Sequence, residues 1–137
     1  MNDRNTSFLL AVNGTLMRGL ELERNMIDNG ASFECEAKTA PCYRLWSVND
    51  AYPAMIRVAT EDPDAAAIDV EVWRVPALGL AHILDGEPPG LAIGKIKLDD
   101  GRIVFGVIAE PLTVKDMREI TSFGGWRAYI KSIAKSD

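Results

Sequence analysis

The heptapeptide from Asn13 to Gly19, NGTLMRG, combines residue types and spacing that could do chemistry. It follows an apolar run, Phe8 to Val12, that predicts a buried strand, and it precedes a predicted helix over 20–27. A strand-to-helix turn leaves backbone N–H groups without partners above the strand end. Gly14 allows a tight bend there, and Arg18 adds a fixed positive charge. We therefore expect this loop to capture a small carboxylate or amide oxygen, although an ordinary strand-to-helix connection has the same pattern.

Two other segments could contribute to a pocket. The segment from Ser122 to Gly125 offers a hydroxyl group, N–H groups and two glycines before the last predicted helix. It would form a second wall opposite the NGTLMRG loop, or it would be a tight start of that helix packed under the sheet. Arg44, on a predicted strand, would bind a substrate carboxylate or pair with a surface acid. The candidate ligand-binding residues are Asn13, Gly14, Thr15, Leu16, Arg18, Arg44, Ser122, Gly124 and Gly125.

The residues that most often bind metals are scarce. His82 is the only histidine, and it lies in a helix predicted over 76–84, where it would be an acid–base group or a packing residue. Cys35 and Cys42 flank a predicted turn, so they could pair across a hairpin or stay as free thiols in a reducing compartment. Two cysteines and one histidine are too few for a usual zinc site. We expect no metal and no cofactor.

Bulk properties exclude several classes of protein. The 137 residues, 47% of them apolar, are sufficient for one domain with a real core, and we expect a single domain over 1–137. A net charge of −5 argues against a nucleic-acid partner, which requires a basic face. The run from Phe8 to Val12 is too short to span a membrane, and the residues before it lack the pattern of a signal peptide. We expect a cytoplasmic protein with no membrane partner.

The elements that must position these residues follow from periodicity. Strands are predicted over 31–37, 42–48, 54–59 and 68–73, and Asp99-Asp100-Gly101 predicts a hairpin joining 91–98 to 102–109. Helices are predicted over 20–27, 76–84, 114–120 and 126–135. No regular strand–helix–strand rhythm appears, which argues against a doubly wound parallel sheet. We expect an α+β protein with a mixed sheet curled into a small barrel and short helices on its flank.

Several motifs resemble a known superfamily along nearly the whole chain. NGTLMRG resembles the YGTLMRG loop of the gamma-glutamylcyclotransferase-like superfamily, with Asn13 in place of the tyrosine. The segment from Ile120 to Tyr129, ITSFGGWRAY, closely resembles the end of the C-terminal domain of allophanate hydrolase, a divergent branch of that superfamily. Other stretches that resemble the superfamily or the branch are Tyr43 to Trp46, Tyr52 to Ala54, Thr39 to Leu45 and Leu91 to Lys95. The resemblance implies the superfamily's small-barrel fold.

The resemblance also implies a candidate base. Enzymes of the superfamily place a glutamate after a helix, in an LDxxEG context beside the YGTL loop, where it takes a proton from the substrate's α-amine. The amine then attacks the γ-amide carbonyl. Leu84-Asp85-Gly86-Glu87 falls at this place but one residue short, so Glu87 is the implied general base, on a loop that Pro88 stiffens. The alternative for Glu87 is an exposed loop residue, and Glu71, on a predicted strand, is a second candidate base.

The allophanate hydrolase branch differs at one position of the loop. That branch commonly carries a histidine there, in a GxHxxG arrangement, which resembles the residue tied to decarboxylation of the carboxylated urea intermediate. Leu16 stands at this position. One hypothesis is therefore a protein that binds a small amide or ureido acid. If it is an enzyme, it would transform this ligand by cyclotransferase-, lyase- or decarboxylation-type chemistry. The alternatives are a non-catalytic accessory or binding module for a separate amidase, and a homodimeric structural protein.

Overall fold

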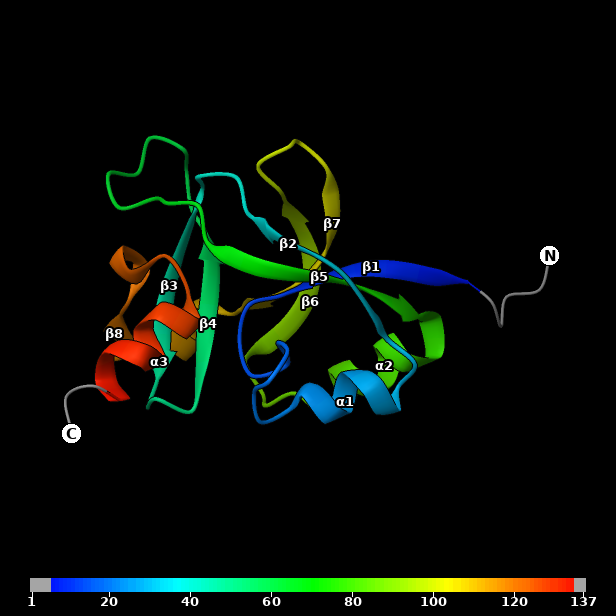
Figure 1. Ribbon diagram of the computed structural model, residues 1–137. Coiled ribbons are helices and arrows are strands. Elements are labelled where there is room, and N and C mark those ends of the chain that lie inside the picture. The colour runs from blue at the N-terminus through cyan, green and yellow to red at the C-terminus, as the bar shows by residue number, and fades with distance from the viewer. Residues whose placement is uncertain (1–5, 135–137) are drawn as a thin grey trace.

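The computed structural model describes residues 6–134, which form strands and short helices arranged as Figure 1 shows. The strands of this part of the chain are β1 (Ser7–Val12), β2 (Ser32–Lys38), β3 (Tyr43–Val48), β4 (Tyr52–Arg57), β5 (Asp69–Pro76), β6 (Leu91–Lys97), β7 (Ile103–Ala109) and β8 (Arg118–Glu119). The helices are α1 (Glu23–Asp28), α2 (Ala77–Asp85), α3 (Trp126–Ala134) and the 3₁₀-helices η2 (Pro111–Val114) and η3 (Thr121–Phe123). The chain is therefore of the predicted α+β class.

The strands form two sheets. The larger one has the order β2-β5-β1-β7-β6, and it is mixed because β1 pairs antiparallel with β5 and parallel with β7. The smaller one has the order β4-β3-β8. In Figure 1, α3 lies against the smaller sheet, whereas α1 and α2 lie side by side at the far end of the larger one.

The larger sheet curls until its two edge strands meet at one end. Just beyond β6, the N–H of Asp99 donates to the carbonyl of Lys38 at 2.9 Å, and the N–H of Ala40 donates to the carbonyl of Lys97 at 2.8 Å. Along the rest of their length β2 and β6 are not paired with each other. The predicted curled mixed sheet is confirmed, but among residues 6–134 the sheet does not close into a complete barrel.

Most predicted elements are confirmed, and one is wrong. The hairpin around Gly101 forms, with that glycine at a φ of 91°, and the helix predicted over 76–84 forms as α2, with Pro76 as its N-cap and not its first residue. The helix predicted over 114–120 is absent. There the chain leaves η2, passes through Asp116 at a φ of 62°, and pairs β8 with β3. A left-handed residue ends a helix, and the sheet edge offers the backbone other partners.

The core lies between the sheets and the helices. The fully buried side chains include Leu10, Tyr43, Leu45, Trp73 and Tyr129. Although β5 alternates in sequence, Val70 to Trp73 are all buried, because Arg18 and Arg127 cover Glu71 on the face that alternation alone would leave exposed. Cys35 is half-buried and Cys42 is buried, and both are free thiols.

Candidate functional site

The loop of residues 13–19 connects β1 to α1, and buried polar groups hold both of its ends. At the start, the side chain of Asn13 is buried, and its Nδ2 donates to the carbonyl of Val107 at 3.2 Å and lies 3.6 Å from Met55 Sδ. At the end, the backbone N–H of Arg18 donates to Glu71 Oε1 at 2.9 Å. The loop is thus fixed without belonging to a helix or a strand.

The middle of the loop presents consecutive backbone N–H groups. The N–H of Met17 donates to the carbonyl of Gly14 at 3.0 Å, and the N–H of Leu22 donates to the carbonyl of Thr15 at 2.9 Å, so the loop carbonyls are used. Within residues 6–134, no hydrogen bond uses the N–H of Gly14, Thr15 or Leu16. Unpaired neighbouring amides of this kind attract carboxylates and oxyanions.

Glu87 lines the same small cavity as Gly14, Thr15 and Leu16. It follows α2, and its backbone N–H donates to the carbonyl of Leu84 at 3.1 Å. Burial raises the pKa of the Glu87 carboxyl group, and no basic side chain of residues 6–134 pairs with it. A desolvated carboxyl group with no cation beside it has the environment of a tuned acid or base. The cavity is lined by Val12, Asn13, Gly14, Thr15, Leu16, Tyr52, Pro53, Glu87, Leu91 and Val107.

The cavity is small because β4 closes it. A Cβ added to Gly14 would lie 2.5 Å from Pro53 Cδ, so only glycine fits there. The volume is about 20 Å³, which accommodates about one water molecule. A ligand larger than water therefore enters only if the start of β4 or the loop between Gly86 and Gly90 moves.

Arg18 and Glu71 belong to a different cluster, on the other side of the loop. Glu71 is 2% exposed and accepts hydrogen bonds from Arg18 Nε at 3.2 Å, Arg127 Nη2 at 3.0 Å and Trp73 Nε1 at 3.2 Å. Burial by itself would raise the pKa of Glu71, but these bonds and the one from the N–H of Arg18 outweigh it and lower the pKa. Glu71 is therefore a fully bonded anion that holds the loop, and Arg18 is directed toward it.

Arg44, Ser122 and Gly124 lie in a third region, beside β8. Arg44 forms two hydrogen bonds to the partly exposed Glu119 carboxylate, at 2.6 and 2.8 Å, and so pairs with an acid of this chain. Ser122 and Gly124 line a depression that also contains Glu119, with none of the loop residues. Gly125 packs against the side chain of Asp69. The structure thus brings Asn13, Gly14, Thr15, Leu16 and Glu87 together and leaves the other candidates elsewhere.

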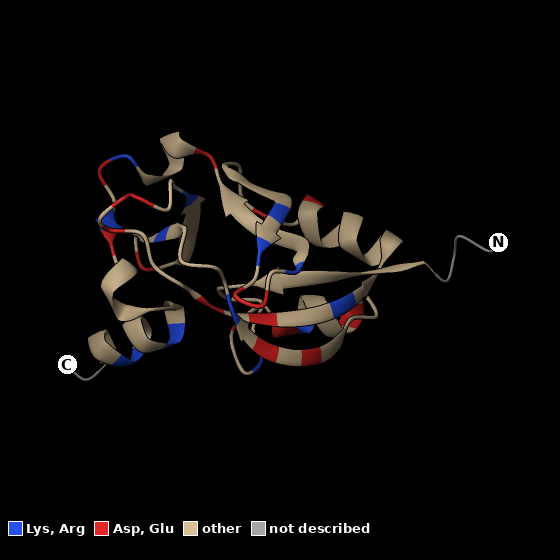
Figure 2. Cartoon of the chain, turned by 90° about the horizontal axis from the view of Figure 1, so that it is seen from above, with Lys and Arg blue, Asp and Glu red and all other residues tan. Residues whose placement is uncertain are grey.

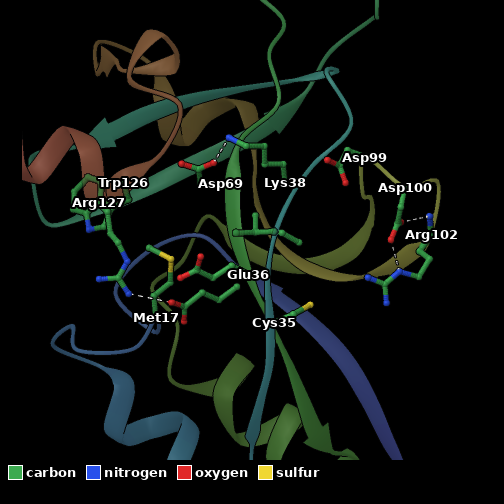
Figure 3. A pocket seen from close by; sticks show the side chains of 13 residues that line it. Met17, Cys35, Glu36, Lys38, Asp69, Asp99, Asp100, Arg102, Trp126 and Arg127 are labelled. Atoms are coloured by element: carbon green, nitrogen blue, oxygen red, sulfur yellow. Dashed lines mark hydrogen bonds and ion pairs between the residues drawn. The ribbon is translucent and has the colours of Figure 1, made fainter.

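A further depression lies beside β2 and was not predicted from the sequence. Its volume is about 530 Å³, and Figure 3 shows charged side chains around it from β2, β5, the β6–β7 turn and the start of α3. Most of these charges are already paired: Lys38 with Asp69 at 2.7 Å, and Arg102 with Asp100 at 2.8 Å. The Asp99-Asp100-Gly101 motif predicted only a turn, which gave no signal for a pocket.

The described residues contain neither a metal-binding cluster nor a membrane-spanning helix. Residues 6–134 contain no group of three or more histidine, cysteine, aspartate or glutamate side chains placed to hold a metal ion. No helix in this part of the chain is long and apolar enough to cross a membrane. His82 lies exposed on α2, away from the Glu87 cavity.

Comparison with known proteins places this fold in context. Residues 8–131 match the family described as the allophanate hydrolase C-terminal domain. The chain is 30% identical to the urea amidolyase of Saccharomyces cerevisiae over 141 residues, an alignment that covers 98% of this chain and 8% of the yeast protein. The chain therefore spans less than a tenth of the curated relatives that it matches.

Solved structures give the same relationship. A uropathogenic E. coli-specific protein matches with a TM-score of 0.88 and 53% identity, over 92% of this chain and 97% of that one. The allophanate hydrolase of Kluyveromyces lactis matches with a TM-score of 0.86 and 28% identity, over 97% of this chain and 22% of that one. A gamma-glutamyl cyclotransferase matches in fold, with a TM-score of 0.53 and 15% identity over 83% of this chain and 70% of that one. The resemblance to the allophanate hydrolase C-terminal domain is confirmed, and so is the gamma-glutamylcyclotransferase-like fold.

Proposed function

The chain belongs to the allophanate hydrolase C-terminal domain family, and on that premise we propose that it binds a small carboxylate, amide or ureido acid at the Gly14–Leu16 amides. The family relates the chain to enzymes of amide and urea metabolism. The observation that supports the site is that Glu87 and the unpaired loop amides share one cavity. The loop would hold the negative oxygens of the ligand, and Glu87 would accept a proton from a ligand nitrogen.

The physical case for Glu87 as the base rests on its surroundings. Desolvation raises its pKa, and a base works best when its pKa approaches the operating pH. The loop is held at both ends by hydrogen bonds, so its amide dipoles are already oriented. They would stabilise developing negative charge on the ligand without reorganising. The cavity has room for about one water molecule, so even a carboxylate or ureido head group would enter only with a movement of the start of β4 or of the loop between Gly86 and Gly90, and a compact head group requires the smallest movement.

Nuclear magnetic resonance titration of the ¹⁵N-labelled protein tests this proposal. The ligands are N-carbamoylglycine as a ureido acid, a γ-glutamyl amide, and acetate as a simple anion. We expect the amide resonances of Gly14, Thr15 and Leu16 to shift with one of the first two ligands at concentrations where acetate has no effect. Unchanged loop amides, or equal shifts with acetate, would rule out a specific site here.

Glu87→Gln separates binding from catalysis. Gln is nearly isosteric and cannot accept the proton, so we expect the variant to retain ligand binding and to lose any turnover of the ligand. Glu110→Gln is the matched control, because Glu110 is exposed and lies outside the cavity. If Glu87→Gln turns over the ligand at the wild-type rate, Glu87 is not the base.

A second function, an accessory module for a separate amidase, is favoured by the length comparison. The relatives carry this domain within much larger chains, of which it is 8% in the yeast urea amidolyase and 22% in the K. lactis allophanate hydrolase. Leu16, in place of the branch's histidine, also fits a domain without its own catalysis. Measuring the rate of a purified amidase with and without this chain tests it, and no change in rate or product would contradict it. For either function we propose a cytoplasmic location.

A further inference from the structure

Helix α2 carries an apolar stripe that the core covers only in part: Leu80 packs against the core, whereas Leu84 is 42% exposed. Its inward side consists of Gly79, which has no room for a Cβ against the backbone of Asn29, and the buried Ile83. A second set of apolar residues follows the spacing i, i+3, i+4, i+7 on a different side of the helix and consists of Ala77, Leu80, Ala81 and Leu84. This spacing is typical of a helix face that packs against another element.

The stripe forms one wall of a groove whose other wall is the sheet. The groove has a volume of about 420 Å³, and Ile93 and Phe105 line it from β6 and β7. Phe105 also lines a neighbouring depression with Phe8 and Ile103, which are 36% and 56% exposed. The apolar surface is thus continuous from α2 across β7 to β1. An extended exposed apolar surface of this kind marks an interaction site.

One base and one acid lie at this surface, the base in the groove and the acid at the helix end beside it, outside the groove lining. Asp85 is the only charged residue of α2 and lies at its C-terminal end, so the rest of the helix is uncharged in Figure 2. Lys95 of β6 lines the groove and forms no ion pair within residues 6–134. A surface with an acid at one point and an unpaired base at another is able to complement itself.

We propose that this groove is the interface with a second copy of the chain, with the two α2 helices antiparallel across a twofold axis. The small side chains Ala77 and Ala81 let two helices approach closely, and Leu84 of each copy would fill the groove of the other. The antiparallel arrangement places Asp85 beside the positive N-terminal end of the other copy's α2 and brings it toward that copy's Lys95. An unrelated acidic partner would complement Lys95 but would bring its negative charge against Asp85, so self-association fits the charges better.

Sedimentation velocity over micromolar to millimolar concentrations tests the proposal. We expect the wild-type protein to dimerise reversibly, and Leu84→Glu to raise the dimer dissociation constant at least about tenfold, because it places a charge in the apolar contact. Leu112→Glu is the matched control, since Leu112 is 78% exposed on η2, outside the groove, and the variant should dimerise as the wild type does. Circular dichroism verifies that each variant is folded.

Charge exchange tests the antiparallel geometry with substitutions of exposed side chains. Asp85→Lys and Lys95→Glu should each weaken the dimer, whereas the protein with both changes should dimerise more tightly than either single variant. A wild-type protein that is monomeric at every concentration, or equal behaviour of Leu84→Glu and Leu112→Glu, would overturn the proposal. It would also fall if the wild type is monomeric and Leu84→Glu abolishes binding to an amidase, which would assign the groove to that partner.

Discussion

Glu71 binds Arg18 twice, through the backbone N–H at 2.9 Å and through Nε at 3.2 Å, and this pair fixes the end of the loop whose middle faces Glu87. Arg127 completes the arrangement, because its Nη2 donates both to Glu71 Oε2 and to the carbonyl of Arg18. The start of α3 is therefore joined to the NGTLMRG loop through one buried carboxylate, although the loop and the helix are far apart in the sequence.

Glu71→Gln should destabilise the protein by about 2–3 kcal/mol, because it removes charge-assisted hydrogen bonds at a buried site. This loss of stability is small for the breaking of a buried ion pair, because the side chains of Arg18 and Arg127 are 40% and 42% exposed and water can solvate them when Glu71 is neutral. Urea denaturation measures it. Glu36→Gln is the control: this partner of Arg18 is 78% exposed, and its loss should cost less than about 0.5 kcal/mol.

The pH dependence of the same pair has a definite sign. The pKa of Glu71 is lower in the folded protein than its ordinary value of 4.5. Its stabilisation is therefore complete above pH 4.5 and is lost as the pH falls through the folded-state pKa. Wild-type protein and Glu71→Gln should differ most in stability near neutral pH and converge in strong acid. A difference that stays constant down to strong acid would contradict the shift.

Glu87→Gln should have the opposite effect and stabilise the protein at neutral pH. Burial raises the pKa of Glu87 in the folded state, so this group costs free energy of folding increasingly as the pH rises above its ordinary pKa of 4.5, and the cost is complete above the folded-state pKa. The gain should disappear as the pH falls below the ordinary pKa of glutamate, where both folded and unfolded wild-type chains are protonated. Thermal melts across this range measure the gain, and Glu110→Gln should show none. A variant less stable than the wild type at neutral pH would contradict the desolvation of Glu87.

Gly14→Ala should close the Glu87 cavity and destabilise the fold by about 1–3 kcal/mol, because the new methyl group would overlap the ring of Pro53. Gly86→Ala is the matched control. Its Cβ would meet nothing nearer than 3.7 Å, and its φ of −83° suits any residue. We expect Gly14→Ala to lose ligand binding and Gly86→Ala to keep its stability. Equal stability of the two variants would contradict the prediction, because it would mean that Pro53 at the start of β4 moves away from the new methyl group at little cost in free energy.

Tyr43→Phe should weaken the connection between the two sheets. The hydroxyl group of Tyr43, on β3, accepts a hydrogen bond from the N–H of Lys97, on β6, at 3.0 Å. Removing it leaves a backbone donor unpaired, at a cost of about 1–3 kcal/mol. Hydrogen exchange at Lys97 should accelerate more than at Ile96, its buried neighbour in β6. Exchange of Lys97 at the wild-type rate would mean that water replaces the hydroxyl group.

The sequence determined the local elements and the position of the amide loop. The Asp-Gly turn at Gly101 and the helix that begins directly after Pro76 are signals carried by neighbouring residues, and both elements formed. The helix predicted over 114–120 did not form. The spacing of its apolar residues suits a helix, but the edge of β3 offered its backbone other hydrogen-bond partners. Periodicity cannot detect a strand of two residues.

Only the tertiary structure decided which side chains meet. The sequence shows that Arg18 and Arg44 are always charged, but each pairs with whichever acid the fold brings near. Their partners, Glu71 for Arg18 and Glu119 for Arg44, lie 53 and 75 residues away along the chain. Glu87 and the Gly14–Leu16 amides came together because α2 returns the chain to the end of β1. The curl of the sheet depends on contacts between Lys38 and Asp99, which no local pattern encodes. Residue chemistry is local and can be predicted from the sequence, whereas the pairing of charges across the fold depends on long-range packing.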